Sequence, residues 1–239
     1  MAYKAATRSP FFLYLTLAFL AIAIAGFSTT LFAPVARGEF KAPLVIRIHG
    51  ALLFGWLTFL IAQASLIHSK NVRIHRRIGW FGAILCVAII VSVVLVDLFT
   101  TRRDLAAGAE GPIIGNFVNI LIEMILFGSL VGTAIFLRRD TESHKRLLVL
   151  ATISILGPAW LRFRHFMPFV PNPFVAFSFV ADSVLLVVIA RDWIAFRRVH
   201  RVYLWVGGIM VAIHAVELSA IESQPWLRLG RWLLGEAAV

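Results

Sequence analysis

The chain has 239 residues, of which 60% are hydrophobic and 15% are charged, with a mean hydropathy of +0.89 and a formal net charge of +11. Soluble domains carry about 25% charged residues, so this composition excludes a water-facing globular protein, and the long apolar blocks indicate a membrane protein. The cations lie in short segments between the apolar blocks, where topology and anionic lipid headgroups account for them, so we expect no nucleic-acid partner.

Seven apolar runs follow one another along the sequence, and each is near the roughly 20 residues that a helix needs to cross the hydrocarbon layer. They cover residues 10–34, 42–68, 78–100, 112–137, 147–165, 174–190 and 202–221. The first run could be a signal peptide, but its apolar core exceeds the roughly 7–15 residues of a signal sequence, which favours a transmembrane helix. We therefore predict an all-α fold, with one transmembrane domain over residues 1–239 that contains seven helices.

Lysine and arginine residues are divided unevenly between the two faces that seven spans would create. Of the 23 cations, 14 fall on the face that includes the amino terminus. The positive-inside rule therefore predicts the amino terminus inside and the carboxyl terminus outside. Residues 225–234 alternate tryptophan and leucine with two arginines, which is typical of a short helix lying in the outer interface.

A histidine beside cations precedes three of the runs, at His75, His144 and His200. Two of these motifs, HRRIGWFGA and RRDTESHKRLLVLATI, resemble a family of bacterial multi-pass membrane proteins without assigned function, and the likeness covers most of residues 40–190. The resemblance implies a bacterial cytoplasmic membrane and assigns no catalytic residue. Histidines at helix ends in a small bundle are also distantly similar to b-type transmembrane cytochromes.

Topology explains the cations of these motifs but not their histidines. In one interpretation the histidines are interfacial residues that cap backbone or contact headgroups. In the other, His68, His75 and His144 converge at the inner mouth of the bundle as ligands of a metal or haem. The spacing leaves both interpretations open.

Ionisable side chains within the apolar runs form a second group of candidates, because such residues are costly in lipid and usually face the bundle interior. At about 1.5 Å per helical residue, Glu123, Asp182 and His214 all fall near the membrane midplane. The outer half holds His49, Arg162, His165 and Glu217. These positions predict a polar pocket that opens outward between the second, fourth, fifth, sixth and seventh helices.

We favour a histidine-ligated cofactor site in this pocket, with a redox or cofactor-handling role. The candidate haem-binding residues are His49, His165, His214 and Arg162. The candidate ligands of a divalent metal are His49, His214, Glu217 and Glu123. The metal set rests on the i, i+3 spacing of His214 and Glu217, which resembles the paired His/Glu spacing of metal sites in helix bundles.

Two further accounts of the pocket stay open. A proton-coupled or small-molecule pathway could use Glu123, Asp182 and Arg162. Alternatively, Arg162 could pair with either carboxylate and fix the packing of the bundle without any activity. No Ser-His-Asp or Cys-His arrangement has a recognisable local signature, so the sequence does not decide whether the protein is an enzyme.

Overall fold

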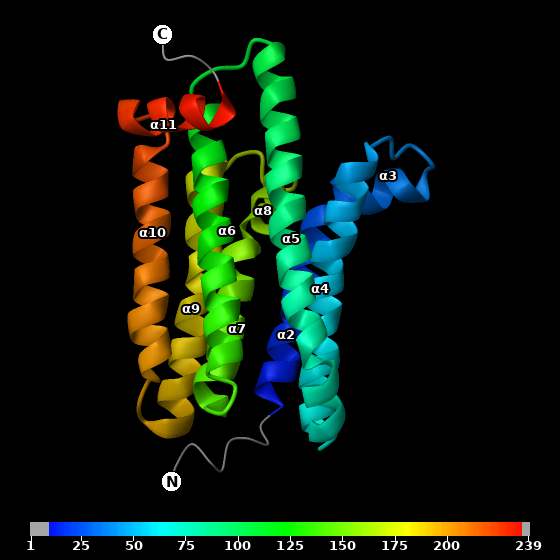
Figure 1. The fold of residues 1–239 in the computed structure, drawn as a ribbon, viewed down its shortest axis with the longest axis vertical. Coiled ribbons are helices and arrows are strands. Elements are labelled where there is room, and N and C mark those ends of the chain that lie inside the picture. Colours follow the sequence, from blue (N-terminus) through cyan, green and yellow to red (C-terminus); the bar gives the residue numbers. More distant parts are fainter. Residues whose placement is uncertain (1–9, 236–239) are drawn as a thin grey trace.

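The computed structural model describes residues 10–235, which form a bundle of helices (Figure 1). Within these residues every regular element is a helix. Seven segments are long and apolar enough to cross a membrane: Phe11–Ala36, Leu44–His68, Val72–Ala106, Pro112–Phe136, Thr141–His165, Pro173–Phe196 and Val202–Ala220. The predicted all-α fold with seven membrane-crossing segments is confirmed, and the chain is a multi-pass membrane protein in contact with the lipid bilayer.

Four of these segments are single helices and three are composite. The single helices are α4 (Leu44–His68), α5 (Val72–Ala106), α6 (Pro112–Phe136) and α9 (Pro173–Phe196). The composite segments consist of α2 (Phe11–Phe27), the π-helical turn η2 (Ser28–Phe32) and α3 (Ala33–Ala36); of α7 (Thr141–Ile155), α8 (Gly157–Leu161) and the 3-10 turn η3 (Arg162–His165); and of the π-helical turn η4 (Val202–Val206) and α10 (Gly207–Ala220). Proline accounts for two of the breaks, because the second residue of α3 (Pro34) and of α8 (Pro158) is a proline, which donates no backbone hydrogen bond.

Two helices begin ahead of the apolar runs that were predicted to start at residues 78 and 147. α5 begins at Val72 and α7 at Thr141, so the HRR and HKR motifs lie within helices. The Asp140 side chain explains the start of α7, because it accepts hydrogen bonds from the backbone N–H groups of Glu142 and Ser143 at 3.2 and 3.3 Å. These are donors that the first turn of a helix otherwise leaves without partners.

Packed aromatic side chains hold the centre of the bundle. The Trp56 side chain of α4 is 1% exposed, and its indole N–H donates to the Thr152 hydroxyl of α7 at 3.2 Å. The same ring packs edge-on against Phe127 of α6, with centroids 5.2 Å apart. Large apolar side chains also cover the outside, as a lipid environment permits, among them Ile84, Val87, Phe136 and Ile194.

The loops and the last helix define two ends of the bundle. The start of α2 and the loops over residues 69–71, 137–140 and 197–201 lie together at one end, which we call the basic end (Figure 1). At the opposite end, the α11 end, helix α11 (Gln224–Leu234) lies across α10 and packs on α6. Gly115 permits the close approach here, because a Cβ at this residue would lie 1.8 Å from the carbonyl oxygen of Ile221.

Candidate functional site

Two clusters of ionisable side chains are buried between the helices. The first, which we call the arginine network, lies near the basic end and consists of Glu142, Lys145, Arg146, Arg191 and Asp192. The second, which we call the histidine cluster, lies within the spans and consists of Glu123, Asp182, His214 and Glu217.

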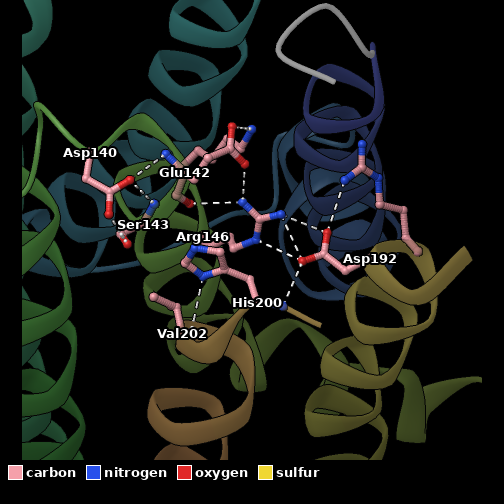
Figure 2. A network of polar contacts seen from close by, with 9 residues as sticks. Asp140, Glu142, Ser143, Arg146, Asp192, His200 and Val202 are labelled. Atoms are coloured by element: carbon pink, nitrogen blue, oxygen red, sulfur yellow. Dashed lines mark hydrogen bonds and ion pairs between the residues drawn. The ribbon is translucent and has the colours of Figure 1, made fainter. Parts of the chain in front are cut away.

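Arg146 is the centre of the arginine network, with a side chain that is 0% exposed (Figure 2). Its Nε and Nη2 atoms donate to the Asp192 carboxylate of α9 at 3.0 and 2.8 Å. Its Nη1 donates to the Glu142 carboxylate one turn earlier in α7 at 2.6 Å. The guanidinium also lies 5.4 Å from the ring centre of Tyr203 in η4, so one side chain joins three elements.

The other members of the network complete the charge pairing around Arg146. Arg191 donates to Asp192 at 3.1 Å, and Lys145 donates to Glu142 at 2.7 Å. The backbone N–H of His200 also donates to Asp192, at 3.3 Å. Both carboxylates therefore have cationic partners, as a stable buried ion pair requires.

Two groups in the loops beside the network have shifted pKa values. The hydrogen bond from the Ser143 hydroxyl, at 2.6 Å, lowers the pKa of Asp140 from its usual value. Burial lowers the pKa of His200, and the nearby charge of Arg146 lowers it further. Near neutral pH this end of the bundle therefore favours an ionised Asp140 and a neutral His200.

The imidazole of His214 is the centre of the histidine cluster. Its Nδ1 lies 2.6 Å from a carboxylate oxygen of Asp182 on α9, and its Nε2 lies 2.9 Å from a carboxylate oxygen of Glu123 on α6. The three side chains are 13–15% exposed. One side chain of α10 thus meets carboxyls from two other helices, each well inside its span.

Glu217 adds a third carboxyl one turn further along α10. It is 7% exposed, and the charges of Glu123, His214 and Asp182 all act on it. Asn119 holds this turn in place, because its amide donates to the Glu217 backbone carbonyl at 3.3 Å. The Asn119 side-chain oxygen in turn accepts a hydrogen bond of 2.7 Å from the Trp226 indole, which ties α11 to the cluster.

The histidine cluster has more acidic groups than basic ones. Three carboxyls face one imidazole, and within residues 10–235 no lysine or arginine forms an ion pair with them. Both carboxyl oxygens of Glu123 and the Oε1 atom of Glu217 are buried without an aligned hydrogen bond from any described group. Uncompensated carboxylates are strongly disfavoured in lipid, so the arrangement favours the uptake of protons or of a cation.

A cavity of about 330 Å³ adjoins the cluster between α6, α10 and α11. Its walls are formed by Ile122, Ile209, Ala212, Ile213, Val216, Glu217 and Trp226. The surface of this cavity is apolar, and exposed Ile209, Ala212 and Val216 show that it opens to the outside of the bundle. This differs from the broad polar pocket that the sequence predicted.

The structure separates the predicted cofactor ligands into different parts of the molecule. His49 lies on α4 with its Nδ1 3.3 Å from the Ser92 hydroxyl of α5, whereas His214 lies on α10 at the opposite side of the bundle (Figure 1). His165 is exposed in η3. Among the described residues there is no group of three or more His, Cys, Asp or Glu side chains arranged to hold a metal ion.

Arg162 also lies outside the histidine cluster. Its guanidinium donates to the Thr30 hydroxyl at 3.2 Å and to the Pro158 carbonyl at 2.7 Å, and it lies 4.0 Å from the ring centre of Phe27. Arg162 therefore links the composite spans Phe11–Ala36 and Thr141–His165. The suggested pairing of Arg162 with Glu123 or Asp182 is not formed.

The possible inner-face site is assembled only in part. The rings of His75 on α5 and His144 on α7 lie edge-on with centroids 6.5 Å apart. His68 is exposed at the end of α4. The Nδ1 of His144 lies 2.7 Å from the backbone carbonyl of Ala134, which fits an N–H donor at that atom and the interfacial interpretation of this histidine.

Sequence reasoning missed the arginine network. Arg146 and Arg191 were counted only as topological cations, and Asp192 was not considered. One local signal was present, because Glu142 and Arg146 stand at i, i+4, the spacing of ion pairs on a helix. The pairing of Arg146 with Asp192 spans 46 residues and has no such signal.

No family model, curated protein or solved structure matches the chain.

Proposed function

We propose that this protein provides a proton pathway in the membrane and that the histidine cluster is its proton-binding site. The excess of carboxyl groups carries the proposal, since Glu123, Asp182 and Glu217 face a single imidazole within the spans. Sharing protons among these groups removes most of the cost of burying their charge. Of the accounts drawn from the sequence, the proton-coupled pathway has the most support in this geometry.

His214 suits the role of a relay because its two ring nitrogens face carboxyls on two different helices. The 2.6 Å contact with Asp182 is a hydrogen bond, and the 2.9 Å contact with Glu123 allows proton transfer once the ring N–H aligns with that oxygen. A protonated ring gives the Nε2 proton to Glu123 and takes another at Nδ1 from Asp182 after the ring turns or exchanges tautomer. Glu217 lies one turn nearer the α11 end and is the next acceptor in that direction.

Proton flux in liposomes tests the proposal. The purified chain is reconstituted with a pH-sensitive dye inside, and a potassium gradient with valinomycin drives protons inward. We expect Glu123→Gln and Asp182→Asn to lower the flux at least about tenfold, as removal of a proton-transfer group does. Glu222→Gln, at an exposed residue beyond α10, is the matched control and should leave the flux unchanged.

The proposal fails if the wild-type protein gives no flux above empty liposomes, or if both cluster variants conduct as well as the wild type. Size-exclusion profiles of the variants in detergent show whether the bundle still assembles. A loss of flux with an unchanged profile identifies a functional role for the carboxyls.

The predicted metal or haem role can be tested on the same protein, although the described residues contain no group of three or more His, Cys, Asp or Glu side chains arranged to hold a metal ion. Elemental analysis and an optical spectrum, after expression with metal and haem supplied, separate this role from the proton pathway. A stoichiometric metal that His214→Ala removes would replace the proton pathway with a metal site. A haem band would restore the predicted cofactor role.

The proposed orientation places the basic end in the cytoplasm of a bacterial cell, near anionic headgroups. The three loops at that end of the bundle contain Lys70, Arg138, Arg139, Arg197, Arg198 and Arg201, which supports the positive-inside assignment. Reporter fusions in the loop over residues 69–71 should report a cytoplasmic location, and an external report there would reverse the orientation.

A further inference from the structure

Helix α5 presents one continuous face to the outside of the bundle. Large apolar side chains follow this face at steps of four, three and four residues, and each is 52–65% exposed: Trp80, Ile84, Val87 and Val91. Side chains at this spacing lie along one side of a helix. Over these residues, about 16 Å of the helix is therefore open to an acyl chain.

Arginines continue the same face where α5 reaches the basic end. Arg77 and Arg73 stand three and seven residues before Trp80, which places them on the same side of the helix, and both are exposed. Within residues 10–235 neither guanidinium forms an ion pair with a carboxylate. The face is therefore apolar along the span and positively charged at the basic end.

A third guanidinium reaches this face from the loop between α6 and α7. Arg138 is exposed, and its Cζ atom lies 5.8 Å from the centre of the Trp80 ring, within the range of a cation–π contact. Its Nη1 donates to the Ile135 carbonyl at 3.2 Å. Asp140, in the same loop, uses its carboxylate to cap α7 instead. The ring and the carbonyl thus hold a guanidinium in place beside the apolar face.

We propose that this face of α5 binds one anionic phospholipid. The phosphate lies between Arg77 and Arg138, the glycerol backbone lies beside Trp80, and an acyl chain follows the apolar side chains along the span. Guanidinium groups donate paired hydrogen bonds to phosphate oxygens, and indole rings favour the level of the headgroups.

The apolar continuation of the face favours a lipid over a free phosphate compound, which would contact only the arginines. The arrangement also differs from the general attraction of anionic headgroups to every cation at the basic end. It combines charge, an aromatic ring and an apolar track on one side of one helix. The inference is independent of the proton pathway, because it uses no residue of the histidine cluster.

Native mass spectrometry of the intact chain, titrated in detergent with phosphatidylglycerol, tests the inference. We expect one phosphatidylglycerol to bind at least about tenfold more tightly than phosphatidylcholine with the same acyl chains, which carries no net charge. An arginine near a headgroup contributes a factor of about five, so Arg77→Gln and Arg138→Gln should each weaken binding about fivefold and the double variant about 25-fold.

Arg201→Gln is the matched control, because it removes the same charge from an exposed residue at the same end. The loop over residues 197–201 lies across the basic end from α5, so this variant should bind as the wild type does (Figure 1). Trp80→Leu keeps the arginines and an apolar side chain but releases Arg138 from the ring. It should weaken binding about two- to fivefold, which gives a second test should the double variant fail to assemble.

Three results would overturn the inference. The first is equal binding of phosphatidylcholine, and the second is wild-type affinity in both the double variant and Trp80→Leu. The third is displacement of the lipid by glycerol phosphate, the headgroup without its chains, at the same concentration, which would assign the arginines to a free phosphate compound.

Discussion

The arginine network and the histidine cluster both bury ionisable side chains between three elements of the bundle, yet they differ in how charge is balanced. Arg146 donates to two carboxylates, and each of those carboxylates has a second cation. Around His214 the ratio is reversed, because three carboxyls face one imidazole and several carboxyl oxygens have no aligned partner within residues 10–235.

This difference assigns the two regions different tasks. A buried ion pair with its hydrogen bonds satisfied holds helices in one arrangement, and removing either partner is expensive. A buried group that lacks its counter-charge stores free energy that a proton or ligand can release on binding. The arginine network near the basic end therefore holds α7, α9 and η4 together, and the histidine cluster is the proposed functional site.

The largest loss of stability should follow from removing the central residue of the arginine network. Arg146→Met leaves the Asp192 carboxylate, 1% exposed, without its main partner, and we expect a loss of about 3–5 kcal/mol in the free energy of unfolding. Thermal unfolding in detergent measures it. Arg139→Met, at an exposed residue, is the matched control, and equal stabilities of the two variants would contradict the role given to the network.

A smaller loss of stability should follow from a substitution where α6 lies against the end of α10. In Gly115→Ala the added methyl group would meet the Ile221 carbonyl, so α6 must move away from the end of α10, at a cost of about 1–3 kcal/mol. Gly132→Ala is the control on the same helix, because a Cβ there meets no atom of the described part of the chain within 4 Å. If both substitutions left the unfolding temperature unchanged, α6 and the end of α10 would not be in the close contact described at Gly115.

Asp140, which caps the start of α7, should contribute about 1 kcal/mol to the free energy of unfolding, and this contribution should depend on pH. The pKa of Asp140 is lowered in the folded protein, so its contribution is present above the unfolded value of about 3.9 and is lost as pH falls through the folded pKa. Asp140→Ala should lower the unfolding temperature near neutral pH and remove part of this acid sensitivity. Asp140→Asn keeps the capping oxygen, so it should retain most stability while losing the same pH dependence.

The smallest effect on stability is expected at the site itself. Glu123→Gln removes an uncompensated carboxyl, so the free energy of unfolding should stay within about 0.5 kcal/mol of the wild-type value or rise. Asp192→Asn, the same chemical change in the arginine network, should destabilise strongly. Thermal unfolding compares the two variants. Similar losses of stability would contradict the different roles given to the arginine network and the histidine cluster.

The sequence predicts the spans well because hydropathy is a property of contiguous residues. It also places Glu123, Asp182 and His214 at one depth, since depth follows from counting residues along each helix. It does not predict which helices adjoin, because that depends on packing between residues far apart in the chain. His49 and His214 therefore looked compatible with one site although α4 and α10 lie on opposite sides of the bundle.

The length of α5 sets a condition on the membrane around the protein. Of its 35 residues, those from Ile78 to Thr101 lie between arginines at both ends, a stretch of about 36 Å. A hydrocarbon layer is about 30 Å thick, so this helix must tilt, or the bilayer must thicken around it, to keep Arg77 and Arg102 at the headgroups. A helix that is longer than the hydrocarbon layer favours the thicker regions of a membrane.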